Sequence, residues 1–242
     1  MNIKKISLCI FILFVCACST SKHSLNYFER FKMIQNTINP DFEKFDAIAF
    51  EAKKNTLIAS GYEIKYDNVN KTTKSNLTHY GSVYIIKEYD DNHNLIKETR
   101  KDDQIAIETD YLDEFMAYGR TFFSNGNIQN KGIGSWLGFA IGKQYLFNRE
   151  GDLLEMKDND IGYQFDYHQV FDFCKEHDIQ LTKNTRQQSL KIRKSLESDH
   201  VTHTWIIENP LYDLREYEIF VLDGNTGEVL RSFKTPFITD GL

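Results

Sequence analysis

Cysteine and proline are scarce in this chain of 242 residues, which contains four cysteines and three prolines. Cys9, Cys16 and Cys18 all fall at the amino-terminal end, so Cys174 is the only cysteine in the remainder of the chain. A framework of disulfide bonds is therefore excluded as the source of stability. The protein must instead bury a hydrophobic core, which a chain of this length can do.

The apolar run near the start of the chain is too short for a transmembrane helix, and positive charge is not in excess. The run from Ile6 to Ala17 is roughly a dozen residues long, whereas a spanning helix needs about 20. The formal net charge is −6, and removal of Lys4 and Lys5 with a cleaved signal would make it more negative. A nucleic-acid partner is therefore not expected.

The first 18 residues have the pattern of a secretory signal, with two lysines, an apolar core and a small residue before a cleavage site. The stretch Val15-Cys16-Ala17-Cys18 resembles the lipobox of bacterial lipoprotein precursors. In that family an aliphatic residue stands three positions before the modified cysteine and a small residue directly before it. The resemblance implies that residues 1–17 are removed and that Cys18 carries the lipid. The alternatives are Cys16 as the anchor, which fits less well, and a cleaved signal without lipid.

Ser19 follows Cys18 where an aspartate would, in many such lipoproteins, retain the product in the inner membrane. The resemblance therefore implies attachment to the outer membrane. One acyl chain holds a protein only weakly, because each buried methylene contributes about 0.8 kcal/mol. The family carries more than one chain, so we expect a lasting anchor at the cell envelope.

Aromatic residues make up 14% of the chain, which is typical of a folded, strand-rich protein. We predict an α+β fold with a tether at 18–24, helices at 25–60, β-hairpins at 61–160 and an α+β region at 161–242. The second amino-terminal helix is expected to begin at Asn39-Pro40-Asp41. Its buried face would contain Phe42, Phe45 and Ala49, and Gly61 would end it.

Three stretches in the hairpin region have a common pattern: "EYDDNHNLIKE", "FFSNGNIQNKG" and "LFNREGDLLEM". Each contains an aromatic residue, a polar turn and an aliphatic residue, which predicts a β-hairpin. The matching positions are Tyr89 with Leu95, Phe123 with Ile128, and Phe147 with Leu153. The pattern resembles the MORN-like repeats of bacterial toxin–antitoxin-associated proteins.

The last region combines helical and strand patterns. "DYHQVFDFCKEHDI" predicts a helix capped by Asp166, with Tyr167, Val170, Phe171 and Cys174 on one stripe. A second helix is expected at about 185–196, followed by the strand "THTWIIE" and the hairpin "YEIFVLDGNTGEVLRSF". This order resembles PepSY-like modules of secreted bacterial proteins, with the C-terminal helices packed on a β-hairpin. Such modules are taken to bind or inhibit partners.

No pattern in the chain predicts catalysis, a metal or a cofactor. G-x-S-x-G is absent, and Cys174 lies on an apolar stripe, where a free cysteine is usually a buried small side chain. The acidic stretches at 158–162 and 223–227 fit turns better than calcium loops, and the glycine-rich segment at 131–145 lacks the end of a phosphate loop. We predict that the protein is not an enzyme.

Five residues are candidates for contact with a partner: Trp136, Arg186, Lys191, Arg193 and Lys194. Tryptophan at an exposed bend is a favoured binding anchor, but the pattern around Trp136 favours packing in the core over this role. The basic residues, expected on the second C-terminal helix, could face an acidic partner or anionic headgroups, or form a solvated face. We predict non-catalytic protein binding, in its most concrete form by an immunity protein against an interbacterial toxin. A structural or surface-maintenance lipoprotein is the alternative, and an envelope enzyme the third.

Overall fold

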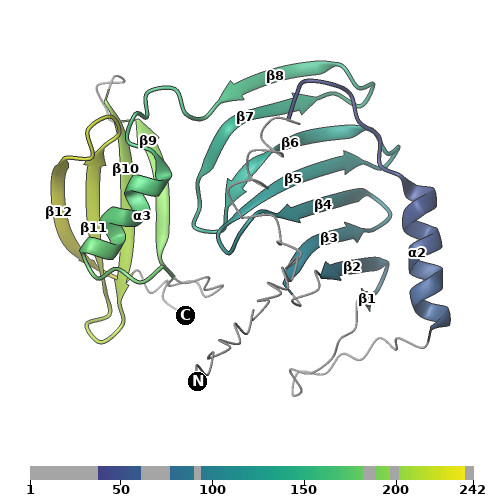
Figure 1. The fold of residues 1–242 in the computed structure, drawn as a ribbon, viewed down its shortest axis with the longest axis horizontal. Coiled ribbons are helices and arrows are strands. Elements are labelled where there is room, and N and C mark those ends of the chain that lie inside the picture. The colour runs from purple at the N-terminus through teal and green to yellow at the C-terminus, as the bar shows by residue number, and fades with distance from the viewer. Residues whose placement is uncertain (1–37, 61–76, 90–93, 182–188, 197–201, 238–242) are drawn as a thin grey trace, which may run out of the picture.

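The computed structural model describes residues 38–60, 77–89, 94–181, 189–196 and 202–237. Two antiparallel sheets lie side by side (Figure 1), one with eight strands in the order β1 to β8 and one with the order β12-β11-β10-β9. The strands of the large sheet are β1 Leu77–Tyr80, β2 Val83–Tyr89, β3 Leu95–Lys101, β4 Ile105–Tyr111, β5 Met116–Phe123, β6 Ile128–Ser135, β7 Ala140–Phe147 and β8 Leu153–Asp158. The strands of the small sheet are β9 Lys191–Leu196, β10 His203–Leu211, β11 Glu216–Asp223 and β12 Val229–Pro236.

The predicted α+β class is wrong, because the described residues are mostly β and contain two helices, α2 (Ala47–Ala59) and α3 (Tyr167–Glu176). The helix predicted at about 185–196 is contradicted by β9. Strand β9 pairs antiparallel with β10, and its residues Lys191, Ile192 and Arg193 alternate between exposed and buried. Pairing with a long neighbouring strand thus overrides the weak helical preference of this short segment.

Helix α2 begins seven residues later than predicted. The segment before it runs beside the β5–β6 turn, where Ile128 N–H donates to Glu43 O at 3.0 Å and Phe45 N–H donates to Gly126 O at 2.8 Å. Only then does Asp46 cap the helix by accepting from Ala49 N–H at 2.8 Å. Of the residues predicted on its buried face, Phe45 is buried, whereas Phe42 and Ala49 are exposed. Phe50 provides the buried contact of α2 itself.

The three hairpin patterns are confirmed as the pairs β2–β3, β5–β6 and β7–β8. Tyr89 pairs with Leu95 and Phe147 with Leu153, as expected, while Ile128 pairs with Phe122. Each hairpin has a register shift directly beside this pair. A bulge strengthens the local twist, so the shared sequence pattern corresponds to a shared bend near each turn.

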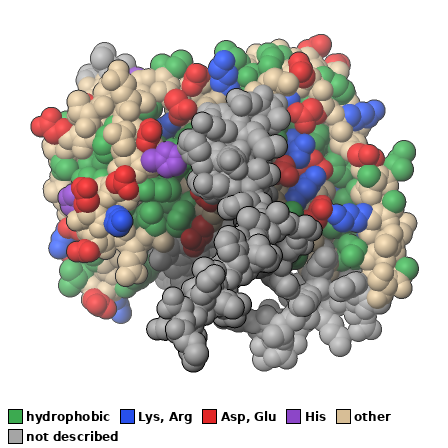
Figure 2. Space-filling model, in the orientation of Figure 1, with side chains coloured by type: hydrophobic (Ala, Val, Ile, Leu, Met, Phe, Trp, Pro, Cys, Tyr) green, Lys and Arg blue, Asp and Glu red, His purple; other side chains and the backbone are tan. Residues whose placement is uncertain are grey.

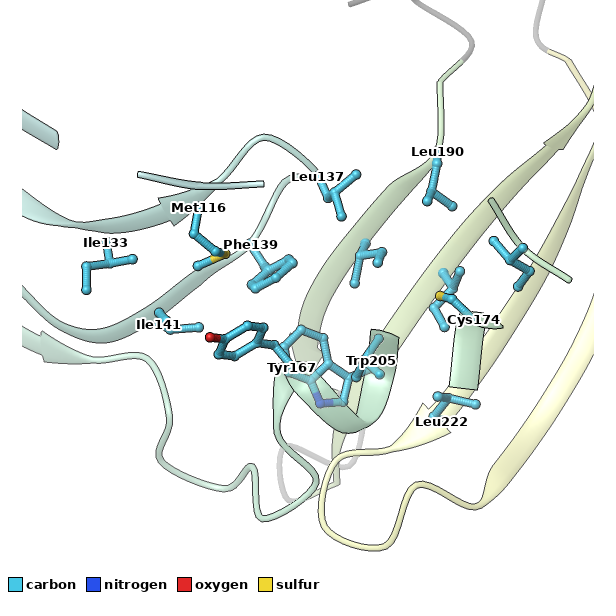
Figure 3. Close-up of a cluster of buried hydrophobic side chains, with 14 of the residues drawn as sticks. Met116, Ile133, Leu137, Phe139, Ile141, Tyr167, Cys174, Leu190, Trp205 and Leu222 are labelled. Carbon is cyan, nitrogen blue, oxygen red and sulfur yellow. The ribbon is translucent and has the colours of Figure 1, made fainter. Parts of the chain in front are cut away.

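A large core cluster joins the two sheets. Figure 3 shows Met116 and Phe139, from the large sheet and its turns, on the side that faces Trp205 of the small sheet, with Tyr167 of α3 beside them. The rings of Phe139 and Trp205 meet edge to face with centroids 5.3 Å apart. Helix α3 supplies the stripe predicted from the sequence, and Asp166 and Gln169 form a capping box at its start.

A second core cluster lies on the same side of the large sheet, nearer to β1 and α2. Its buried members are Phe45, Phe50, Leu77, Ile86, Ala106, Phe122, Ile128, Tyr145 and Phe147. The ring of Phe45 lies 5.8 Å from that of Phe50 and 5.6 Å from that of Phe122. Through these contacts α2 and its leading segment are held against the sheet.

Several predicted features lie outside the described residues. These are the lipobox with Cys18, the tether at 18–24, the part of the predicted helical region before residue 38, the start of the predicted hairpin region at 61–76 with Gly61, and Arg186. Among the residues that are described, no helix is both long and apolar enough to cross a membrane.

Candidate partner-binding face

Both hydrophobic core clusters lie on one face of the large sheet. The opposite face of β4 to β7 is therefore the candidate binding surface. We call it the open face. Register places its residues in rows across the strands: Thr109 lies opposite Gly119, and Gly119 opposite Gly132. The open face consists of Ile107, Thr109, Tyr111, Ala117, Gly119, Thr121, Asn130, Gly132, Gly134 and Gln144.

A hollow of about 300 Å³ lies on the open face. Its floor is low because the central residues of β5 and β6 are glycines. A Cβ atom added at Gly119 would meet no atom within 4 Å, whereas one at Gly132 would lie 2.5 Å from Gln144 Cγ. Gly132 therefore permits close approach of β7, and Gly119 leaves space above the sheet. Five neutral polar residues line it as well, Thr109, Thr121, Asn130, Ser135 and Gln144, together with Ile107, Ala117 and Arg120.

Trp136 stands at the rim of this hollow, in the turn between β6 and β7. Its side chain is 50% exposed, and its ring stacks on Tyr111 with centroids 5.9 Å apart and an interplanar angle of 20°. The position agrees with an exposed bend and not with core packing, although its binding role remains a prediction. Burial, with smaller effects from Glu98 and Tyr89, raises the pKa of Tyr111 to about 12, so its hydroxyl stays protonated.

The turn that carries Trp136 is fixed by its backbone. Trp136 N–H donates to Phe115 O at 2.9 Å, and Gly138 N–H donates to Ser135 O at 3.1 Å. Gly138 has a φ of +110°, a region that disfavours side chains. Leu137 points into the core, so its neighbour Trp136 is turned outward.

The same turn joins the small sheet. Ile192 N–H of β9 donates to Leu137 O at 2.8 Å, which brings the Trp136 turn alongside the strand that carries Lys191 and Arg193. Both cations are exposed and share one face of β9. Glu208 lies opposite Lys191 and forms an ion pair with Arg193, so two cations surround one carboxylate.

Lys194 does not belong to this exposed basic group. Its ammonium donates to Asn159 O at 2.7 Å and to Asp160 Oδ1 at 2.8 Å. The same nitrogen lies 4.6 Å from the centroid of Tyr163 and 5.0 Å from that of Trp205. Lys194 therefore ties the turn after β8 to the small sheet and is not available as predicted.

A belt of charged side chains crosses the core face of the large sheet, and sequence reasoning missed it. Arg120 Nη2 lies 3.0 Å from Glu108 Oε2 and 2.7 Å from Asp110 Oδ2, and Arg120 Nη1 lies 3.5 Å from Glu43 Oε2. Lys131, with no exposed side-chain area, pairs with Glu43 at 2.6 Å. Figure 2 shows acidic and basic side chains intermixed over the large sheet. These residues come from separate segments of the chain, so no pattern within one segment predicted the charged belt.

Two features that the sequence raised for catalysis, the thiol of Cys174 and a metal site, can be checked among the described residues. Cys174 is fully buried, and that burial raises the pKa of its thiol to about 12, so the nucleophilic thiolate is disfavoured. Among the described residues, no group of three His, Cys, Asp or Glu side chains could hold a metal ion.

No protein-family model, no curated protein and no solved structure matches the chain.

Proposed function

We propose that the protein is a lipid-anchored, non-catalytic protein-binding module of the bacterial cell envelope, attached to the outer membrane through Cys18. The stacked pair of Trp136 and Tyr111 beside the hollow carries this proposal. Aromatic side chains dominate the energetics of protein interfaces, and the neutral polar lining can bond to a partner's backbone. The expected partner inserts an apolar side chain into the hollow and presents carboxylates to Lys191 and Arg193.

The most concrete form of this function is an immunity protein that neutralises a toxin delivered between bacteria. The likeness of the three hairpins to MORN-like repeats supports this form, and an outer-membrane anchor would hold the binder where a toxin arrives. A structural or surface-maintenance lipoprotein is the competing assignment.

Co-expression with the protein encoded beside it tests the proposal. A stoichiometric complex that restores growth is the expected result, and Trp136→Ala should abolish both binding and rescue. Rescue at amounts far below the toxin would indicate turnover and an enzyme. Loss of envelope integrity on gene deletion, without any toxin, would favour the surface-maintenance role.

Gly119→Val provides a second variant with a clear expectation. The added side chain enters open space, and valine suits a strand better than glycine. The variant should therefore fold as well as the original chain but bind the partner at least about tenfold more weakly, because the hollow is filled. Unchanged affinity would show that the hollow is not part of the binding surface.

A further inference from the structure

Strand β8 forms one edge of the large sheet and exposes apolar side chains. Leu154 is 61% and Met156 53% exposed, and Leu153 is exposed as well. An edge strand offers its unpaired backbone groups to a further strand unless charges or proline protect it. Strand β12, at the edge of the small sheet, has such protection from Arg231, Lys234 and Pro236. Strand β8 contains no proline, and its charged residues are of both signs, Glu155, Lys157 and Asp158, so a second strand can pair with it if opposite charges meet.

The direction of the backbone groups of β8 follows from one hydrogen bond. Asn159 N–H donates to Gly142 O at 2.9 Å, and these residues flank the opposed pair Lys143 and Asp158. Asp158 therefore belongs to a non-hydrogen-bonded pair, and its own N–H and C=O point away from β7. Because directions alternate along a strand, the N–H and C=O of Met156 also point outward.

We propose that β8 pairs antiparallel with β8 of a second copy of this chain, about a two-fold axis through Met156. In this register the outward N–H and C=O groups of Met156 form hydrogen bonds with the C=O and N–H groups of Met156 in the second copy. Glu155 then lies opposite the partner's Lys157, and the two-fold axis repeats this ion pair. Both residues lie on the side of the open face, opposite Leu146 and Gln144, so that face would continue across the dimer.

The charges of Glu155 and Lys157 favour this register over the neighbouring one, in which the two-fold axis passes through Glu155. A two-fold axis through Glu155 would also bring outward N–H and C=O groups of the two strands together. That register, however, sets the two Glu155 side chains directly opposite each other. Like charges opposed across strands are destabilising, whereas opposite charges stabilise the pair. An isologous contact of this kind closes on itself and stops at a dimer.

Cysteine cross-linking of the full chain in its native membrane tests the geometry. The paired Cα atoms of Met156 should lie about 5.5 Å apart, within disulfide range, so Met156→Cys should form a covalent dimer on mild oxidation. The matched control Glu155→Cys places its two Cα atoms roughly 8 Å apart and should not. Absence of a dimer from Met156→Cys, or equal cross-linking of both variants, overturns the proposal.

Charge exchange tests the register independently, by sedimentation of the full chain in detergent. Glu155→Lys and Lys157→Glu each set like charges across the axis, so each should weaken dimerisation by about tenfold. The double variant restores two opposite-charge pairs and should recover the original dimer. Both positions are exposed, so neither change threatens the fold. Single variants that dimerise normally, or a double variant that stays monomeric, contradict the proposed pairing.

Discussion

Ile192 and Leu137 join the two sheets through a backbone hydrogen bond of 2.8 Å, from the N–H of one to the carbonyl oxygen of the other. The bond lies one residue from Trp136 and one residue from Lys191. It connects residues that are 55 positions apart in the chain. The two parts of the candidate binding surface are therefore positioned by one junction.

Gly138 should be sensitive to substitution because it lies directly beside the hydrogen bond between Ile192 and Leu137. A Cβ atom there would lie 3.3 Å from Ile192 O, and the φ of +110° disfavours a side chain. We expect Gly138→Ala to lower the free energy of unfolding by about 1–3 kcal/mol. Gly119→Ala, in open space with an ordinary φ, is the control and should be neutral or slightly stabilising in denaturant titrations. Equal losses from both variants would show that the junction carries no special constraint.

The pair of Lys131 and Glu43 should respond asymmetrically to removal of each partner. Lys131 has no exposed side-chain area, whereas Glu43 is partly exposed. Glu43→Ala leaves a buried ammonium without its carboxylate and should cost about 3 kcal/mol of stability. Lys131→Met removes the buried charge, keeps the volume and leaves a carboxylate that water can reach, so it should cost less. Urea titration would count against the burial argument if Lys131→Met proved the more damaging change.

The thiol of Cys174 should contribute stability that depends on pH. Burial raises its pKa from 9.0 to about 12 in the folded protein, so the folded state favours the protonated thiol. This contribution is fully present below about pH 9 and is lost as the pH rises toward 12. Cys174→Ala lacks it, so the stability difference between original and variant should shrink over that range. A difference independent of pH would contradict the assigned burial.

Thiol reagents give a second measurement on Cys174. At neutral pH the folded protein should react only as fast as it opens, and denaturant should accelerate the reaction strongly. Rapid labelling of the folded chain would mean that the thiol is accessible and reactive.

The lipid anchor predicts a clear difference between two neighbouring cysteines. Cys18→Ala should abolish incorporation of a labelled fatty acid, whereas Cys16→Ala should leave it intact, because Cys16 would leave with the signal. Membrane fractions from cells fed labelled palmitate provide the measurement. Labelling that survives Cys18→Ala would exclude Cys18 as the sole anchor.

The sequence predicted features that depend on short segments. The turns after Tyr89, Phe123 and Phe147 contain their own Asn, Asp and Gly signals, and helix α3 has its cap and stripe within one stretch. By contrast, the segment before α2 follows the β5–β6 turn, a contact about 80 residues away in the chain.

Long-range pairing also explains the misassignment of β9 and the missed charged belt. The pattern of β9 is compatible with a helix until β10 is known to lie beside it. Glu43 and Lys131 are 88 residues apart, and only the folded sheet brings them together. Glycines beside Trp136 suggested an exposed bend, but the sequence favoured core packing for its side chain, and its stacking partner Tyr111 gave no local signal.

Site-specific photo-cross-linking in living cells tests the central claim, that the open face binds a protein partner. A photoreactive residue at Asn130, which is exposed and lines the hollow, should capture one partner of defined mass. The same residue at Ile48, which is exposed on α2, is the control and should capture none. Mass spectrometry of the adduct identifies the partner and distinguishes it from a second copy of this chain. No adduct at Asn130, or the same adducts at both positions, would contradict the account.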